Sequence, residues 1–367
     1  MKAYLDHAAT SPPREEALGA VRAHLETFGN PSSLHGAGRK ARSVLDESRE
    51  RIAAALRCDP RELVFTSCAT EANNLAILGV GRPGRIVTTA IEHPSVLEAC
   101  RISGRELELV PPGPDGAVSP DAFRARGAAI ASMMLVNNET GSIQPVEQVA
   151  GRGEALFHCD AVQALGKVSL DLSRLPVDLL TISSHKVGGP KGAGALFVRK
   201  GIRIAARTVG GGQEFERRAG TENVAAAAGF AAAVEAATQG QAEEATRMRS
   251  LADRLLEGLR RIPGAALNGP ERGRAPHIVN VSLPGVDGEG MAIALDAEGV
   301  AVSTGSACSS LAVEPSHVLQ AMGLSRERIG GSIRFSVGPS TTTEEIDFAL
   351  RAVYALAVRF KEAKGVR

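Results

Sequence analysis

A lysine and an aspartate that each follow an apolar segment are the residues of this sequence best suited to chemistry. Lys186 follows residues 177–182 and opens a glycine-rich loop, and Asp160 follows residues 155–159. A lysine loses its proton readily when it is buried, which makes Lys186 a candidate Schiff-base amine; the alternative is a surface lysine. Asp160 could keep the ring nitrogen of pyridoxal phosphate (PLP) protonated, or it could cap a helix that begins at Ala161.

The chain between Asp160 and Lys186 has room for one crossover and one strand of a parallel sheet. Parallel neighbours bring the ends of their strands to the same edge, where open α/β sheets bind their ligands. The sequence therefore predicts that the carboxylate and the amine face one site.

A phosphate group could bind where the expected strand 62–66 meets a helix that starts near Glu71. The turn between them, residues 67–70, consists of small and hydroxyl side chains, and the free N–H groups at a helix start suit an anion. Ser67 or Thr70 could equally be an ordinary helix cap.

Two further basic side chains could serve the same site. His93 follows the expected strand 85–89, where an imidazole could stack on a pyridine ring and move protons, or lie exposed in a loop. Arg334 lies in the strand-like stretch 331–336, where its guanidinium could bind a substrate carboxylate or form a surface ion pair.

Cys308 is the cysteine best placed to act as a nucleophile. It lies among glycine, serine and alanine in the segment 300–310, a composition typical of a loop rather than of a packed core. An accessible thiol there could react as the thiolate, whereas a free cysteine is more often a small buried residue.

Composition narrows the class of protein. The 367 residues carry a net charge of +1, so nothing indicates a nucleic-acid or membrane surface. Five cysteines, an odd number without paired spacing, favour a reducing compartment. Neither a signal peptide nor an apolar run of about 18 residues is visible. We therefore expect a cytoplasmic protein without nucleic-acid or membrane partners.

The order of apolar segments predicts the fold class. Strands alternate with amphipathic helices over residues 62–200, a pattern typical of a parallel sheet covered by helices. Residues 222–261 are rich in alanine and in charge and contain no proline, which predicts a mostly helical segment.

A second, smaller unit is expected toward the C-terminus. Its expected strands are 278–283 and 333–337, and its expected helices are 290–297 and 344–360. We expect a large domain of residues 13–244 and a small domain of residues 1–12 and 245–367, which carries the Cys308 loop. The first residues should fold back beside the small domain or the active site.

Several short blocks, in this order and spacing, resemble a known family. They are YLDHAAT at 4–10, FGNPSS at 28–33, NNETG at 137–141, GGGQ at 210–213, RAGT at 218–221, STGSAC at 303–308 and TTEEID at 342–347. The chain resembles the cysteine desulfurases of the class-V aminotransferase family, in their NifS/IscS-like type with a long catalytic loop. That resemblance implies an α/β protein of the PLP-dependent aminotransferase fold type I. Its large domain would hold a mostly parallel seven-stranded sheet, and its smaller C-terminal domain would be α+β.

The resemblance implies conversion of L-cysteine to L-alanine with PLP, and a persulfide left on Cys308. Lys186 would carry the cofactor and move the Cα proton, and His93 would stack on the ring and assist. Arg334 would bind the substrate carboxylate, with Asn138 close to the substrate. The residues implied to bind the cofactor are Ala69, Thr70, Asn138, Asp160, Gln163, Ser183, His185, Lys186 and Thr221.

The resemblance also implies partners. The residue that matches Thr221 arrives from the second subunit in this family, so a homodimer is expected. The sulfur would pass to an acceptor protein, such as an iron–sulfur scaffold or a protein that thiolates tRNA or cofactors. No fixed metal site is implied, although Cys308 could contact a nascent iron–sulfur cluster transiently.

Two alternatives stand beside this interpretation. One is another PLP enzyme of the same fold, such as a selenocysteine lyase or an aminotransferase. The other is a scaffold protein without catalysis, against which the presence of Lys186, Asp160 and His93 argues. Cys68 and Ser184 depart from the family pattern, because each stands where glycine is usual. Cys68 could alter the backbone beside the phosphate or add a second thiol there.

Overall fold

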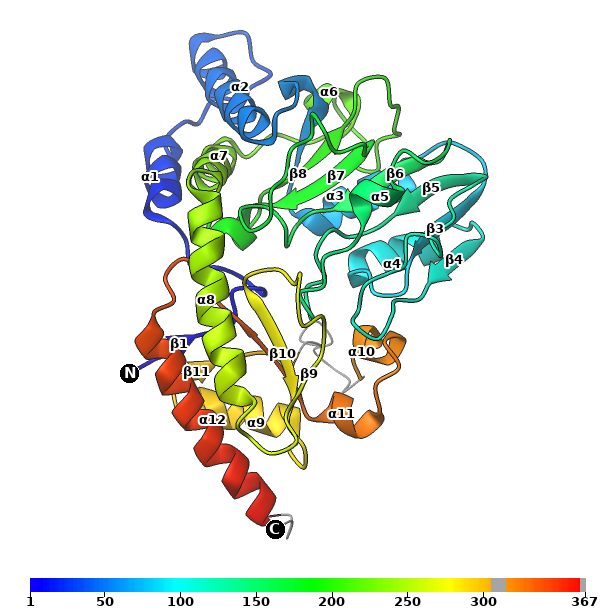
Figure 1. The fold of residues 1–367 in the computed structure, drawn as a ribbon. Helices are drawn as coiled ribbons and strands as arrows, with labels where there is room; N and C mark the ends of the chain where they lie inside the picture. Colours follow the sequence, from blue (N-terminus) through cyan, green and yellow to red (C-terminus); the bar gives the residue numbers. More distant parts are fainter. Residues whose placement is uncertain (305–314, 364–367) are drawn as a thin grey trace.

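The computed structural model describes residues 1–304 and 315–363, and Figure 1 shows a large body above a smaller one. The strands are β1 (Ala3–Tyr4), β2 (Leu63–Thr66), β3 (Arg85–Thr89), β4 (Leu107–Val110), β5 (Ala128–Ser132), β6 (Leu156–Asp160), β7 (Leu179–Ser183), β8 (Gly194–Val198), β9 (Ala266–Leu267), β10 (Ile278–Ser282), β11 (Val300–Ala301) and β12 (Ser332–Ser336). The α-helices are α1 (Glu15–His24), α2 (Gly36–Leu56), α3 (Ala69–Leu78), α4 (Pro94–Ile102), α5 (Val146–Val149), α6 (Gln213–Glu216), α7 (Val224–Thr238), α8 (Gln241–Leu259), α9 (Gly288–Ala297), α10 (His317–Ala321), α11 (Arg326–Gly330) and α12 (Thr343–Ala363). Two 3₁₀ turns are η1 (Pro60–Glu62) and η2 (Ser184–Val187).

The large body is built on a seven-stranded sheet in the order β2-β8-β7-β6-β5-β3-β4. Neighbouring strands from β7 through β4 are parallel, and β8 is antiparallel to both β7 and β2. The prediction of a mostly parallel seven-stranded α/β sheet is confirmed. Because β6 and β7 are parallel neighbours, with Asp160 paired to Thr181, their carboxyl ends open onto the same edge.

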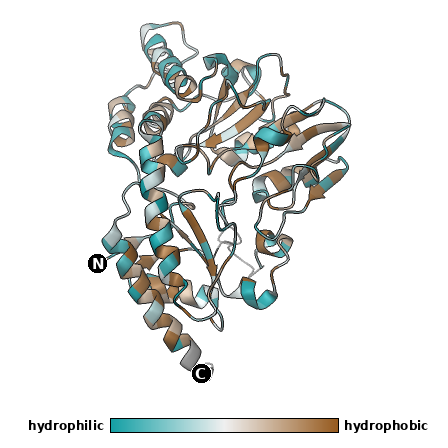
Figure 2. Cartoon of the chain, in the orientation of Figure 1, coloured by the Kyte–Doolittle hydropathy of each residue, from teal (hydrophilic) through white to brown (hydrophobic). Residues whose placement is uncertain are grey.

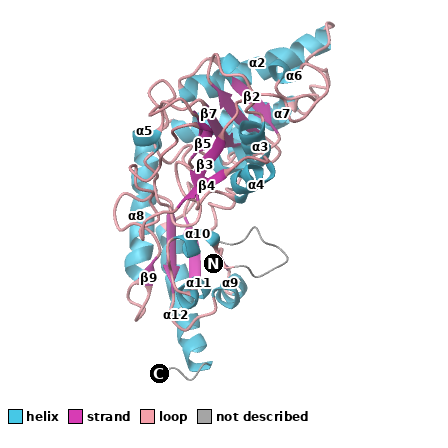
Figure 3. Ribbon diagram, turned by 90° about the vertical axis from the view of Figure 1, so that its right-hand side faces the viewer, coloured by secondary structure: helices cyan, strands magenta, loops and turns pink. Residues whose placement is uncertain are grey.

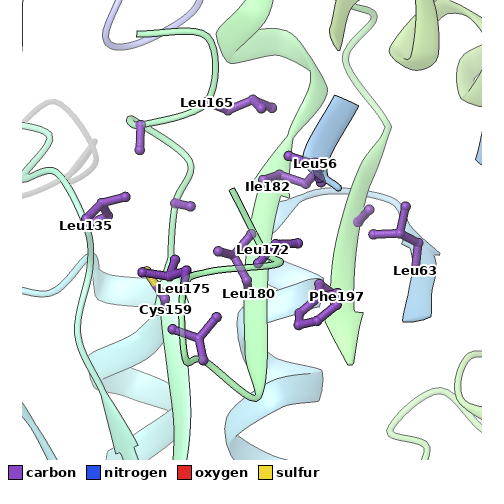
Figure 4. Close-up of a cluster of buried hydrophobic side chains, with 14 of the residues drawn as sticks. Leu56, Leu63, Leu135, Cys159, Leu165, Leu172, Leu175, Leu180, Ile182 and Phe197 are labelled. Carbon is purple, nitrogen blue, oxygen red and sulfur yellow. The ribbon is translucent and has the colours of Figure 1, made fainter. Parts of the chain in front are cut away.

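Both faces of this sheet are covered, which explains why its central strands are buried throughout and mostly apolar (Figure 2). On one face, Leu179 and Leu196 belong to a buried cluster with residues of α3 and α4. On the other face, Leu180, Ile182 and Phe197 belong to a cluster that includes α2 and α7 (Figure 4). Successive residues of β7 and β8 thus serve opposite faces, as the pleat of a strand requires.

The small body has its own core. Its sheets run in the orders β12-β10-β9 and β1-β11, and Figure 3 shows them below the large sheet. Val281 of β10 and Phe335 of β12 pack with residues of α8, α9 and α12. Ala3 and Leu5 join the same core, so the N-terminus does fold back onto this unit. The predicted strands and helices of this region are all present.

The predicted mostly helical segment 222–261 forms two helices, α7 and α8. Gly240 separates α7 from α8 with a φ of 68°, a conformation that favours glycine. The break lets α7 pack against α1, α2 and the large sheet, whereas α8 runs along the small body (Figure 1).

Candidate active site

One cavity of about 380 Å³ opens at the carboxyl edge of the large sheet and gathers most of the predicted site residues. The predicted residues that line it are Ala69, Thr70, His93, Asn138, Asp160, Gln163, Ser183, His185, Lys186 and Arg334. The arrangement draws on α3, β6, β7, η2 and β12, so both bodies contribute to the site.

Lys186 and Asp160 reach this cavity from neighbouring parallel strands, as the sequence predicts. Asp160 is the last residue of β6, and Lys186 lies just beyond β7 in η2. The Lys186 Nζ donates to the backbone oxygens of Ala8 and Ala9, at 2.6 and 2.7 Å. The N-terminal segment therefore holds the amine at the cavity wall.

Two hydrogen bonds orient the Asp160 carboxylate. Asn73 Nδ2 donates to Oδ2 at 2.8 Å, and the Val162 backbone N–H donates to Oδ1 at 3.0 Å. Asp160 thus caps the turn after β6, as the capping interpretation predicts. It also lines the cavity, where the interpretation as a cofactor-binding residue requires it to be. Sequence reasoning missed Asn73; an amide beside Ala72 on the buried face of α3 is the signal that could have found it.

His93 is the N-cap residue of α4, and contacts with Ser95 fix the orientation of its ring. Its Nδ1 accepts the Ser95 backbone N–H at 3.1 Å and lies 2.8 Å from Ser95 Oγ. Burial lowers the pKa of His93 and outweighs the opposing effect of Asp160. The imidazole is therefore neutral near pH 7, with its proton on Nε2, and it is not the exposed loop residue of the alternative interpretation.

The residues implied to bind the cofactor phosphate fit an anion. Ser183 Oγ lines the cavity, is buried, and has no hydrogen-bond partner among the described residues. Ala69 and Thr70 bring the N-terminus of α3 to the same cavity, and the N-cap residue Cys68 makes no side-chain cap bond. The free N–H groups at the start of α3 and the unpartnered Ser183 hydroxyl can donate hydrogen bonds to a phosphate. His185, whose pKa burial lowers to about 4, adds a neutral imidazole.

The two departures from the family pattern are accommodated without strain. Cys68 has a φ of −171°, extended backbone that any residue adopts, so the turn in this chain does not require glycine at that position. Glycine is required opposite it instead, because a Cβ on Gly194 would lie 2.7 Å from the Cys68 carbonyl carbon. Ser184 is buried, and its hydroxyl fills the space that a Cβ on Gly189 would need.

Arg334 lies on β12 with its side chain only 4% exposed, so the alternative of a surface ion pair is wrong. Its Nη2 donates to Asp6 Oδ1 at 2.8 Å, and Nη1 donates to the Asn138 backbone oxygen at 3.0 Å. Nε is buried and has no partner among the described residues. The guanidinium is thus fixed at the cavity wall with N–H groups left for a carboxylate. Asp6, which sequence reasoning did not assign to the site, supplies this support.

Gln163 connects the cavity with the small body. Its Nε2 donates to the Ala8 backbone oxygen at 2.8 Å, and its Oε1 accepts from His277 Nε2 at 3.2 Å. The Ala8 oxygen also accepts a hydrogen bond from Lys186 Nζ, so Gln163 and Lys186 share one carbonyl acceptor. Burial lowers the pKa of His277 well below its usual value, which keeps this ring neutral.

Thr221 does not lie at this cavity. It lines another one, of about 220 Å³, together with Ser67 and Arg218. Its own chain therefore does not bring Thr221 to Lys186.

Cys308 lies outside the described residues, but the chain on either side of its segment is fixed beside the site. Ser303 and Arg334 exchange backbone hydrogen bonds of 3.2 and 2.7 Å. Beyond the segment, Ser316 Oγ donates to Glu139 Oε2 at 2.5 Å, and Glu139 is the neighbour of Asn138.

No group of three or more His, Cys, Asp or Glu side chains that could hold a metal occurs in residues 1–304 and 315–363. Over the same ranges, no helix is both long and apolar enough to span a bilayer.

Comparisons with known proteins agree with this geometry. The family model for class-V aminotransferases matches residues 3–348. The cysteine desulfurase IscS of Dictyoglomus turgidum is 43% identical over 363 residues, covering 95% of this chain and 92% of the relative. The cysteine desulfurase IscS of Methanosarcina thermophila is 41% identical, with 95% and 90% covered.

Solved structures show the same likeness. A NifS-like protein aligns with a TM-score of 0.91 at 35% identity, over 98% of this chain and all of the other. DndA from Streptomyces lividans aligns with a TM-score of 0.76 at 36% identity, over 91% and 99%. Family members depend on PLP, and the cavity described above has the donors that this cofactor needs. The chain belongs to the aminotransferase class-V family, among its cysteine desulfurases.

Proposed function

We propose that this enzyme removes the sulfur of L-cysteine, the activity that the names of its relatives state. The Cβ–S bond of the substrate breaks, a new S–S bond forms on the Cys308 thiol, and the products are L-alanine and a Cys308 persulfide. All atoms of substrate and thiol appear in these products, so no external oxidant or reductant is needed. The outer sulfur then passes to an acceptor protein.

The observation that carries this proposal is that Lys186, Asp160 and His93 face one cavity in a chain of this family. PLP, when bound, supplies an electron sink for the substrate Cα. Asp160 would hold the ring nitrogen, and the two hydrogen bonds that fix its carboxylate support that role. Ser183 and His185, with the start of α3, would hold the phosphate.

The remaining side chains would bind the substrate and move its protons. Arg334 would bind the substrate carboxylate through its remaining N–H groups, because Asp6 and Asn138 already hold its other donors. Lys186 would take the proton from Cα, which its place at the cavity wall permits. His93, neutral with its proton on Nε2, would stack on the ring and assist that transfer.

The test of the proposal compares two cysteine variants of the holoenzyme. Cys308→Ala should abolish release of sulfide from cysteine while PLP stays bound, as followed by its visible absorption. Cys58→Ala is the matched control, because Cys58 is half-buried between α2 and β2, where burial raises the pKa of its thiol to about 12. Full sulfide release by the Cys308 variant would refute the sulfur transfer, and a sample that never takes up PLP would refute the enzyme itself.

We propose further that the protein is a homodimer in which Thr221 of each subunit completes the site of its partner. Support comes from the separate location of Thr221 and from apolar side chains left bare on this chain. Phe28 is 89% exposed and Leu34 91%, both between α1 and α2. Two large apolar side chains exposed in one short connection could form an apolar patch of the kind that an interface covers.

Mixing two inactive variants tests the shared site. Lys186→Ala and Thr221→Ala proteins should each lose activity, and exchange of their subunits should restore it in part, because the mixed dimer contains one intact site. No recovery after demonstrated exchange would contradict the shared site. A monomer in sedimentation would contradict the dimer.

We also propose the division into two domains, a cytoplasmic location and the class of sulfur acceptor that the sequence predicts. The division into 13–244 and 1–12 plus 245–367 is supported by the separate cores of the two bodies. A cytoplasmic location is supported by the free thiols of the described cysteines. Transfer to an iron–sulfur scaffold or a thiolation protein would be tested by tracing labelled sulfur into copurifying proteins.

A further inference from the structure

The backbone of η2, which carries Lys186, has its carbonyl oxygens held one after another. The Ser11 N–H donates to the His185 oxygen at 3.0 Å. Arg14 donates to the Val187 oxygen through Nε at 2.9 Å and to the Gly188 oxygen through its backbone N–H at 2.8 Å. The N-terminal segment thus fixes three of the four carbonyls from residue 185 to residue 188.

The fourth carbonyl, that of Lys186 itself, is held by a side chain. Lys167 Nζ donates to it at 2.8 Å, and the Ser11 hydroxyl lies farther away at 3.4 Å. Lys167 follows the turn that begins at Asp160, and the Ala161 N–H is bonded to β7 through the Thr181 oxygen. The amine therefore connects the segment that carries the predicted ring-nitrogen partner with the turn that carries Lys186.

The setting of Lys167 is unfavourable for a lysine. The residue is 7% exposed and lines a third cavity, of about 160 Å³, beside η2. Burial, then Lys186 and Arg14, lower the pKa of Lys167 to about 7. The titratable or charged groups around it are His185 and Lys186 on η2, His7 and Arg14 on the N-terminal segment, His277 before β10 and Glu244 on α8.

An amine in such a place needs a reason, because an apolar side chain would fill the same space at lower cost. No carboxylate among the described residues forms an ion pair with Lys167. The side chain of Lys167 donates its hydrogen bond to the Lys186 carbonyl. What the amine supplies at this position is therefore the hold on that carbonyl.

We propose that Lys167 is a positioning residue for Lys186: its amine holds the Lys186 carbonyl and so fixes the turn from which the Lys186 side chain enters the cavity. The inference rests on the proposed function, in which Lys186 carries the cofactor. Loss of the hold should displace the Lys186 amine without removing any group that touches substrate or cofactor.

The first test follows covalent attachment of added PLP to Lys186 in the full-length apo-protein, by chemical reduction and intact mass. Lys167→Met should attach the cofactor about tenfold more slowly than wild type, because small displacements of a reacting group are costly in rate. Lys167→Arg, which keeps a donor, should stay within about twofold of wild type. The matched control is Arg274→Met, which removes a buried cation paired with Asp253 and should leave attachment unchanged.

The second readout is stability without cofactor. Between about pH 7 and pH 10.5 the unfolded chain binds a proton at Lys167 that the folded chain has lost, so stability rises with pH over that window. Lys167→Met should lose this rise. Lys167→Arg, charged throughout, should lose it as well.

The outcomes separate this inference from the proposed function. Wild-type protein that never attaches PLP refutes the function. Attachment by Lys167→Met at the wild-type rate, or equal slowing in Arg274→Met, overturns the positioning role while leaving the function intact. If Lys167→Met does not fold, Lys167→Arg decides alone: near-normal attachment without the pH-dependent rise supports the role, and tenfold slower attachment overturns it.

Discussion

Two buried cations of this protein are held in opposite ways. Arg49 of α2 donates to both carboxylate oxygens of Glu214, at 2.8 and 2.7 Å, and its guanidinium lies over the rings of Phe65 and Phe215. Lys167 donates to one backbone carbonyl, and its charge is lost near neutral pH. One charge is matched by an opposite charge, and the other is not.

The difference follows from what each cation stabilises. Gln213–Glu216, labelled α6, is a short turn and not a right-handed helix: Glu214 begins three consecutive residues in the left-handed conformation, with φ of 47°, 59° and 63°, which cost about 1–2 kcal/mol each. A buried, two-point ion pair can offset that strain and fix the segment that leads to Thr221. Lys167 holds a turn at the reaction cavity. The ion-paired cation, Arg49, thus stabilises a strained segment, whereas Lys167, which has no ion pair among the described residues, lies beside the predicted catalytic lysine.

Breaking the matched pair should have the largest effect. Glu214→Ala leaves the Arg49 guanidinium buried without its carboxylate, which should lower the free energy of unfolding by about 3–5 kcal/mol. It also removes the acceptor of the Phe65 backbone N–H. Urea unfolding of the variant beside wild type measures the loss.

The double variant Arg49→Met with Glu214→Leu is the control for this prediction. Apolar residues of similar volume can replace a buried pair at little cost, so the double variant should recover most of the stability lost by Glu214→Ala. A double variant as unstable as Glu214→Ala would mean that segment 213–222 depends on the charges themselves.

Supplying Lys167 with a carboxylate should make its region resemble that of Arg49. Ser11 is the position for it, because the Ser11 hydroxyl and the Lys167 amine share the Lys186 carbonyl. In Ser11→Asp the new charge raises the pKa of Lys167, so the stability gained between pH 7 and pH 10.5 should shrink by about 1–3 kcal/mol. Ser11→Asn has the same shape without the charge, and an equal change in both variants would contradict this account.

A buried acid gives the mirror image of Lys167. Burial raises the pKa of Glu92 to about 8. Between about pH 4.5 and pH 8 the folded chain keeps a proton that the unfolded chain releases, so this group lowers stability as the pH rises.

Glu92→Gln should remove that pH-dependent loss and keep an oxygen for Thr89 and Met134. We expect wild type to lose on the order of 1–2 kcal/mol more than the variant between pH 5 and pH 8 in thermal unfolding. Exposed Glu98→Gln on α4 is the control and should leave the pH dependence unchanged. Parallel curves for wild type and Glu92→Gln would show that Glu92 is ionised in the folded protein.

Sequence reasoning found those site residues whose position depends on local pattern. Apolar runs locate the ends of β6 and β7, and parallel pairing does the rest, which is why Asp160 and Lys186 were predictable together. The strand-to-helix turn at Ala69 was predictable for the same reason. The seven-stranded sheet itself was implied by the family blocks.

The side chains that support the site were not predictable in this way. Asn73, Asp6 and Lys167 act through contacts with Asp160, Arg334 and Lys186 that are distant in sequence. The spacing of apolar and polar residues along the chain gives no information about such contacts. The left-handed conformation of residues 214–216 could not be predicted from the sequence either, because the residues that usually indicate it are glycine and asparagine. They are held there by tertiary bonds to Glu214.

The smallest effect is expected at a second arginine of α2. Arg51 makes the same two-point contact as Arg49, with Glu235, at 2.9 and 2.5 Å, but the two side chains are 33% and 44% exposed. Hydrogen bonds from Arg51 lower the pKa of Glu235, so any stabilisation is present near neutral pH and is lost as acid protonates that carboxylate. Glu235→Gln should cost about 0.2–1 kcal/mol at low salt and less at high salt, since water and ions screen this pair. A loss as large as that of Glu214→Ala would mean that the two-point geometry, and not burial, sets the strength of these pairs.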